Sequence, residues 1–114
     1  MPEDLIIFKK TYDFSKWLFQ HTTNFPKSHR FSVAVQIENS ILELLRQITI
    51  ANHRRQKMPL LRQADETLLA LKILIRLSHD LKFISTGSFE FAIKQMQEIG
   101  RLLGGWMKSQ TAVS

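Results

Sequence analysis

Residues 58–84 read MPLLRQADETLLALKILIRLSHDLKFI, and this stretch decides the fold. Pro59 stands at its start, where a missing N–H is harmless to a helix, and no glycine or further proline follows within it. Asp65 and Glu66 lie toward the N-terminal end and Lys82 lies in the last turn, as the helix dipole favours. The stretch therefore predicts one uninterrupted helix.

Two apolar stripes run along this predicted helix at about 100° per residue. The first predicts a core face and consists of Leu60, Ala64, Leu68, Leu71, Leu74, Ile75 and Leu81. The second lies on nearly the opposite side and consists of Leu69, Ile73, Leu77 and Ile84. A helix in a monomeric bundle needs only one apolar face, so we predict that Leu69, Ile73 and Leu77 form an oligomer interface. The alternative is that they are ordinary scattered surface residues.

Three further helices are predicted around this one, over residues 3–22, residues 27–55 and from the turn at residues 85–88 to about residue 104. The connections are short, which makes successive helices antiparallel neighbours. The prediction is an all-α, up-down-up-down four-helix bundle spanning residues 1–109, followed by a mobile polar tail at residues 110–114.

The glycines near the C-terminus carry two further expectations. Gly104 and Gly105 are predicted to stop the last helix, after which Trp106 would fold back as an apolar plug. Gly100 lies beside the core stripe and is predicted to allow a close approach by a neighbouring backbone or ring, with Trp17 and Trp106 as the candidates.

Length and composition place limits on the class of protein. The chain has 114 residues, 44% hydrophobic content, no cysteine and a formal net charge of +6. That size suits one domain, and the charge favours polyanionic partners, although a merely basic soluble protein fits as well. Met1 to Asp4 is acidic where a signal peptide would be basic, and no apolar run approaches the roughly 18 residues of a membrane span. We expect a cytoplasmic protein without a membrane partner.

Signatures of catalysis are missing from the sequence. Di-metal sites in helical bundles use Glu-x-x-His pairs, and the residues three after Glu38, Glu43, Glu66, Glu90 and Glu98 are Ile41, Arg46, Leu69, Ile93 and Arg101. No glycine-rich phosphate loop is present. His79 and Asp80 are adjacent, but neighbours on a helix point about 100° apart, so a structural hydrogen bond is the expected role of His79. We expect no enzyme activity, no catalytic residue, no metal and no cofactor.

Basic residues are the remaining chemical signal. Arg54, Arg55 and Lys57 crowd the predicted connection between the second and third helices, beside His53, and Arg62 follows one turn later. A second group is formed by Lys9, Lys10 and Lys16. Arg and Lys contact phosphates without base-specific geometry, so we predict that these seven residues bind nucleic acid. The alternative for the first group is a solvated helix end.

Four segments carry a resemblance to a known family. They are FPKSHRFS at residues 25–32, KMPLLRQAD at residues 57–65, RLSHDLK at residues 76–82 and EIGRLLGGWMKS at residues 98–109. Together they resemble the accessory variability determinant (Avd) family of diversity-generating retroelements, and the last segment is the most specific. Phe89 stands where a tyrosine is expected and Ser78 where an alanine is usual. Neither departure touches the basic positions.

The resemblance implies a four-helix bundle that assembles into a homopentameric barrel. It also implies binding to the retroelement reverse transcriptase and to nucleic acid, either template RNA or cDNA. Such a protein supports mutagenic retrohoming and is not itself catalytic. Two alternatives stay open: a ribosomal RNA intervening-sequence protein, which shares the bundle and the pentamer, and a purely structural oligomer without nucleic acid.

Overall fold

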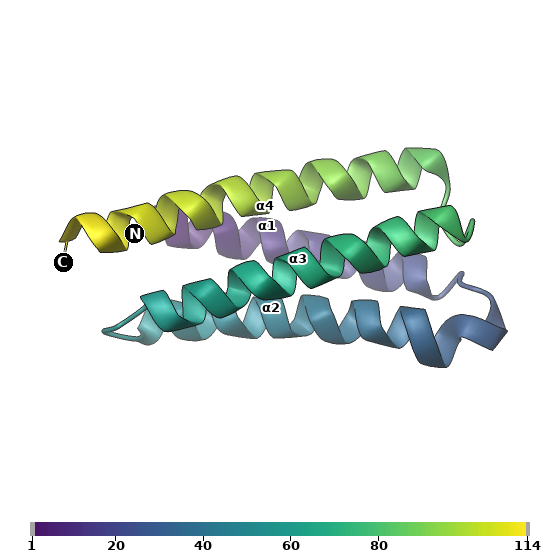
Figure 1. Cartoon of the computed structure of the whole chain (residues 1–114), viewed down its shortest axis with the longest axis horizontal. Coiled ribbons are helices and arrows are strands. Elements are labelled where there is room, and N and C mark those ends of the chain that lie inside the picture. The colour runs from purple at the N-terminus through teal and green to yellow at the C-terminus, as the bar shows by residue number, and fades with distance from the viewer. Residues whose placement is uncertain (1, 114) are drawn as a thin grey trace.

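The computed structural model describes residues 2–113 and shows four long helices in up-down-up-down order (Figure 1). Helix α1 spans Pro2–Thr22, α2 spans Val35–His53, α3 spans Met58–Asp80 and α4 spans Thr86–Val113. A 3-10 turn, η1 (Lys27–His29), and a π-helical segment, η2 (Arg30–Ala34), precede α2. The described residues contain no strand, and the molecule measures 48 × 24 × 19 Å. The predicted all-α four-helix bundle is confirmed.

Each helix packs against its neighbour in the chain, and α1 also packs against α4, so the four helices enclose one core. In this arrangement α1 lies diagonally across from α3. Every helix contributes fully buried side chains, among them Ile7, Phe14, Ile41, Leu44, Leu61, Leu71, Met96, Ile99 and Leu103. Burial of these apolar surfaces is the main favourable term for the fold.

The core face of α3 follows most of the predicted stripe. Leu60, Ala64, Leu68, Leu71 and Ile75 are buried, and Leu74 packs against the core while partly exposed. The prediction missed Leu61 and Ser78, which are also buried. It was wrong for Leu81, which is 47% exposed.

The reason lies at the end of α3, which stops at Asp80 rather than continuing to residue 84. Lys82 adopts a left-handed backbone with φ of 65°. The N–H of Lys82 donates to His79 O at 2.9 Å, and the N–H of Phe83 donates to Ser78 O at 2.8 Å. This pair of bonds is the Schellman arrangement that closes a helix C-terminus, although glycine usually occupies the left-handed position. The chain therefore turns away just after Leu81.

Helix α4 differs most from the prediction, because it continues through Gly104 and Gly105 to Val113. Neither glycine has a positive φ, so neither forms the left-handed turn that ends a helix. Trp106 is only 1% exposed and belongs to the core as part of the continuous helix, not as a plug that folds back. Residues 110–113 are therefore helical, while the proposed division of the chain after residue 109 and the mobility of the tail stay predictions.

The second predicted helix begins where expected but is irregular at first. Its opening turns are η1 and η2, and regular α geometry starts only at Val35 and ends at His53. The closing turn of α1 is tied to this region, because Thr22 Oγ1 donates to Glu38 Oε2 at 2.6 Å.

Gly100 does not have the close neighbour that the sequence suggested. A Cβ at this position would lie 3.5 Å from Leu68 Cδ2 and 3.9 Å from Lys72 Nζ, and no tryptophan is near it. Both distances are ordinary contacts. The expectation that Gly100 is needed for close packing is therefore wrong, because a methyl group fits.

Candidate nucleic-acid and assembly surfaces

The connection between α2 and α3 forms one end of the bundle. The N-terminal end of α1 and the C-terminal end of α4 lie at the same end (Figure 1). Arg54, Arg55 and Arg62 are exposed there, and none of them joins an ion pair with another described residue. We call these three residues the arginine tip. Their guanidinium groups are available to phosphate oxygens.

Lys57 belongs to the same loop but has a different environment. Its Nζ donates to three backbone carbonyl oxygens at the end of α2, those of Ala51 at 2.9 Å, Asn52 at 3.1 Å and Arg54 at 2.7 Å. These contacts use all three donors of the ammonium group. Lys57 therefore caps α2, and its predicted contact with phosphate would require these bonds to break.

The lysines of α1 are a separate group. At 1.5 Å per residue, Lys9 lies about 10 Å and Lys16 about 21 Å along α1 from its first residue. Lys9 Nζ is 3.1 Å from Asp13 Oδ2, and Lys16 Nζ is 3.7 Å from Asp13 Oδ1. The hydrogen bond from Lys9 is the main cause that lowers the pKa of Asp13, and the charge of Lys16 lowers it further. One carboxylate thus neutralises part of this patch.

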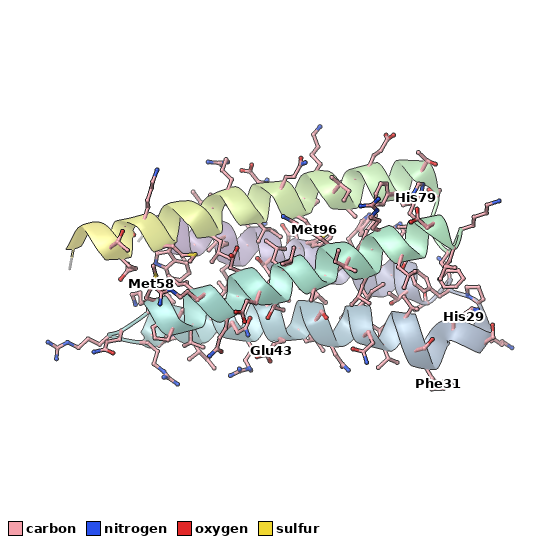
Figure 2. The ribbon with its side chains drawn as sticks, in the orientation of Figure 1. His29, Phe31, Glu43, Met58, His79 and Met96 are labelled. Carbon is pink, nitrogen blue, oxygen red and sulfur yellow. The ribbon has the colours of Figure 1, made fainter. Side chains whose placement is uncertain are left out.

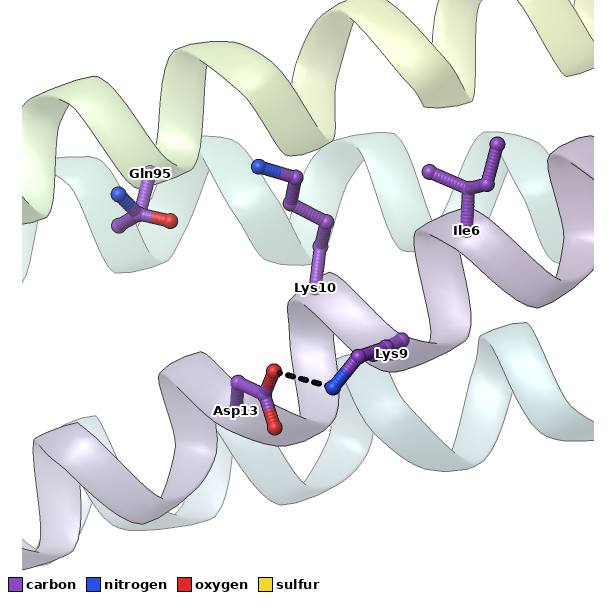
Figure 3. Close-up of a pocket in the computed structure, with 5 residues that line it drawn as sticks. All are labelled: Ile6, Lys9, Lys10, Asp13 and Gln95. Atoms are coloured by element: carbon purple, nitrogen blue, oxygen red, sulfur yellow. Dashed lines mark hydrogen bonds and ion pairs between the residues drawn. The ribbon is translucent and has the colours of Figure 1, made fainter.

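Lys10 points in another direction from Lys9, toward α4 (Figure 3). With Ile6, Lys9, Asp13 and Gln95 it lines an open hollow of about 300 Å³ between α1 and α4. The structure therefore does not gather the seven predicted cations into one cluster. It separates the arginine tip from the lysines of α1.

Lys108 is an exposed cation outside the seven predicted from the sequence. It lies on the last turns of α4, at the end of the bundle that carries the arginine tip (Figure 1). The expected stop at Gly104 had placed it outside the helix. The signal available in the sequence was the spacing of Ile99, Leu103 and Trp106, which continues the apolar stripe of the helix past Gly104.

Two other arginines are already paired with carboxylates on their own helices. Arg46 Nη2 is 2.6 Å from Glu43 Oε1, and Arg101 Nη2 is 2.6 Å from Glu98 Oε1. In each pair the hydrogen bond from the arginine is the main cause that lowers the pKa of the glutamate. The pairing distinguishes both residues from the arginine tip.

The second apolar stripe of α3 is exposed as predicted for three of its four members. Leu69 is 62% exposed, Ile73 is 59% exposed and Leu77 is 41% exposed, while Ile84 packs partly against the core. We call Leu69, Ile73 and Leu77 the α3 face. That another subunit covers it stays a prediction.

His79 has the structural environment expected for it, at the end of the bundle opposite the arginine tip (Figure 2). Its ring stacks on Phe89 with centroids 4.2 Å apart, and Nε2 lies 3.3 Å from Thr86 Oγ1. Its Nδ1 is 3.9 Å from Asp80 Oδ1, too far for a hydrogen bond. Among the described residues no three His, Asp or Glu side chains are grouped as metal ligands would be. None of the helices within residues 2–113 has the length and apolarity needed to cross a membrane.

The architecture defines a class, the antiparallel four-helix bundle proteins. One solved structure in this class is a protein of unknown function from the S23 ribosomal protein family of Bacteroides thetaiotaomicron. It superposes with a TM-score of 0.85 at 17% sequence identity, covering 93% of this chain and 98% of its own. At that identity the likeness establishes the fold.

The sequence identifies the family. Residues 5–110 match the family described as bAvd-like, so the chain belongs to the bAvd-like family. The resemblance drawn from the four sequence segments is confirmed by this match. No curated relative matches the chain.

Proposed function

We propose that this protein is a non-catalytic accessory protein of a diversity-generating retroelement, and that it acts in the cytoplasm. It binds the reverse transcriptase and nucleic acid, and so supports mutagenic retrohoming. Membership of the bAvd-like family over residues 5–110 is the observation that carries the proposal. The arginine tip and the α3 face supply the two surfaces that such a role requires.

Binding of nucleic acid rests on charge. Arg54, Arg55 and Arg62 are exposed and lack acidic partners among the described residues, and the whole chain carries a formal net charge of +6. A pentamer would carry a formal charge of +30, five times +6. We propose that phosphates of template RNA or cDNA are bound with little sequence preference, because arginine contacts to phosphate carry no sequence information.

A charge-matched pair of variants tests this surface. The triple variant Arg54→Gln, Arg55→Gln, Arg62→Gln removes the arginine tip and leaves the cap at Lys57 intact. The control Arg46→Gln, Lys94→Gln, Arg101→Gln removes the same charge elsewhere. In fluorescence anisotropy with a labelled single-stranded RNA, the tip variant should lose about 2.1 from the slope of log affinity against log salt, near 0.7 per phosphate contact. Equal effects of the two variants would remove the tip from the binding site.

Assembly rests on the α3 face. A homopentamer should give a light-scattering mass near five times 13.3 kDa. The double change Leu69→Asp, Ile73→Asp should lower that mass while circular dichroism stays helical, because both side chains are more than half exposed. A monomeric wild-type protein at micromolar concentration would contradict the proposed assembly.

The polymerase partner is tested by co-purification with the reverse transcriptase of a diversity-generating retroelement, followed by a retrohoming assay in which this chain is deleted and restored. Restored retrohoming with a stable complex supports the proposal. An intact oligomer that binds RNA but neither the polymerase nor its template would favour a ribosomal RNA intervening-sequence role. One that binds no nucleic acid would favour a purely structural role.

A further inference from the structure

A second exposed apolar surface lies on α1 and α2, away from the α3 face. On α1, Leu5 is 70%, Phe8 39%, Tyr12 46% and Phe19 36% exposed, and on α2, Leu42 is 48% exposed. At 100° per residue the four α1 residues fall within an arc of about 60°. We call these five residues the α1–α2 flank.

The packing of the two helices makes this flank one surface. The bond from Thr22 to Glu38 fixes the antiparallel register, in which each step back along α1 matches a step forward along α2. That register places Phe19 beside Leu42, at the seam between the two helices. The rings of Phe8 and Tyr12 stack with centroids 5.8 Å apart and continue the surface along α1.

The flank is about as large as the largest apolar patch on an ordinary monomer. Its exposed fractions add up to more than two whole side chains. At about 200 Å² for each large side chain, this gives roughly 500 Å², and the α3 face gives roughly 300 Å². The largest apolar patch on a monomer is typically about 300–600 Å² and is often functional. This chain exposes two patches in that range, the flank and the α3 face.

We propose that the α1–α2 flank of one copy binds the α3 face of the next copy. Flank and α3 face together supply roughly 800 Å² of apolar area. A standard interface buries about 1,600 Å² in total, of which about 57% is apolar, or roughly 900 Å². Pairing of two α3 faces would supply only roughly 600 Å² and would leave the flank uncovered. The inference rests on the proposed assembly and specifies which surfaces form it.

The positions of the two surfaces also favour a ring. The flank lies on the side formed by α1 and α2, whereas the α3 face points outward from the helix diagonal to α1. The two directions differ without being opposite, so each copy is rotated relative to the one before it. A head-to-tail contact with such a rotation can close into a ring, whereas self-pairing of one face stops at a dimer.

Mixing two differently altered chains tests the pairing. One chain carries Leu69→Asp and Ile73→Asp, and the other carries Tyr12→Asp and Leu42→Asp. Each chain alone should be monomeric, because each lacks one half of every contact. An equimolar mixture retains one intact pair of surfaces and should give a dimer of twice 13.3 kDa and nothing larger. The control Gln36→Asp, Gln56→Asp adds the same charge at exposed positions outside both surfaces and should keep the wild-type mass.

Failure of this pairing is distinguishable from failure of the proposed assembly. If the wild type and the Tyr12→Asp, Leu42→Asp chain are both oligomeric, the flank is not the counterpart, although the assembly stands. If the wild type itself is monomeric, the assembly fails and the pairing fails with it.

Cross-linking provides a second test, and its outcome does not depend on whether the aspartate variants fold. The chain has no cysteine, so engineered thiols have no background. Ile73→Cys chains mixed with Leu42→Cys or Tyr12→Cys chains should form intermolecular disulfides under mild oxidation. Ile73→Cys chains alone should form few intermolecular disulfides. Efficient disulfides in Ile73→Cys alone, or none in either mixture, would overturn the pairing.

Discussion

The cap formed by Lys57 allows a quantitative prediction. Its ammonium group donates to the carbonyl oxygens of Ala51, Asn52 and Arg54, and such carbonyls at a helix C-terminus have no partner within the helix. Lys57→Met keeps a side chain of similar bulk and removes the donors. Ala51 O would retain the backbone N–H of Arg54 at 3.2 Å, but the other two oxygens would depend on water.

The expected loss follows from the three bonds. At about 1 kcal/mol net for each hydrogen bond, they contribute about 3 kcal/mol, and ordering one lysine side chain opposes this by about 1.5 kcal/mol. The favourable position of a cation at a helix C-terminus adds about 0.5 kcal/mol. The free energy of unfolding should therefore fall by about 2 kcal/mol, which corresponds to a Tm lower by about 10 °C for a domain of this size.

Urea and thermal unfolding followed by circular dichroism would measure this loss, at one protein concentration because assembly stabilises the folded state. Arg55→Met is the matched control, since Arg55 is exposed in the same loop and its replacement by methionine removes the same charge. It should change the free energy of unfolding by less than about 0.5 kcal/mol. If Lys57→Met behaves like the control, the three contacts do not cap α2.

Three further outcomes are expected. Gly100→Ala should raise the free energy of unfolding by up to about 1 kcal/mol, because alanine favours a helix and the added methyl only touches Leu68; a lower Tm would refute this. Asp13→Asn should strengthen RNA binding more than the charge-matched Glu90→Gln if the lysines of α1 bind phosphate, and equal effects would exclude them. The lowered pKa of Asp13 means that its ionised form stabilises the folded state above a pH of about 3.8, the usual aspartate value, and that this contribution is lost as pH falls through the lower folded pKa. Wild type and Asp13→Asn should therefore differ in Tm at pH 7 and converge near pH 2.5 in thermal scans.

Much of the fold could be predicted from the sequence, because helical periodicity is a local property. The spacing of Leu60, Ala64 and Leu68 at every fourth position fixes one buried face of α3 wherever the helix lies. The spacing of Leu69 and Ile73 on the opposite side fixes a second face in the same way. The basic character of the loop after α2 was also evident, since it depends only on which residues are adjacent.

Other features depend on contacts between distant parts of the chain, and only the tertiary structure decided them. Gly104 resembles a helix stop in sequence, but burial of Trp106 among the other helices holds α4 straight. Lys57 looks like one more surface cation until its Nζ is found against the carbonyls of α2. In the sequence, Phe8 and Tyr12 lie at the edge of the apolar arc of the first helix, and helical spacing alone does not distinguish a broad core face from an exposed flank. The number of neighbouring helices limits how much of each helix can be buried, and the four-helix arrangement leaves that flank in solvent.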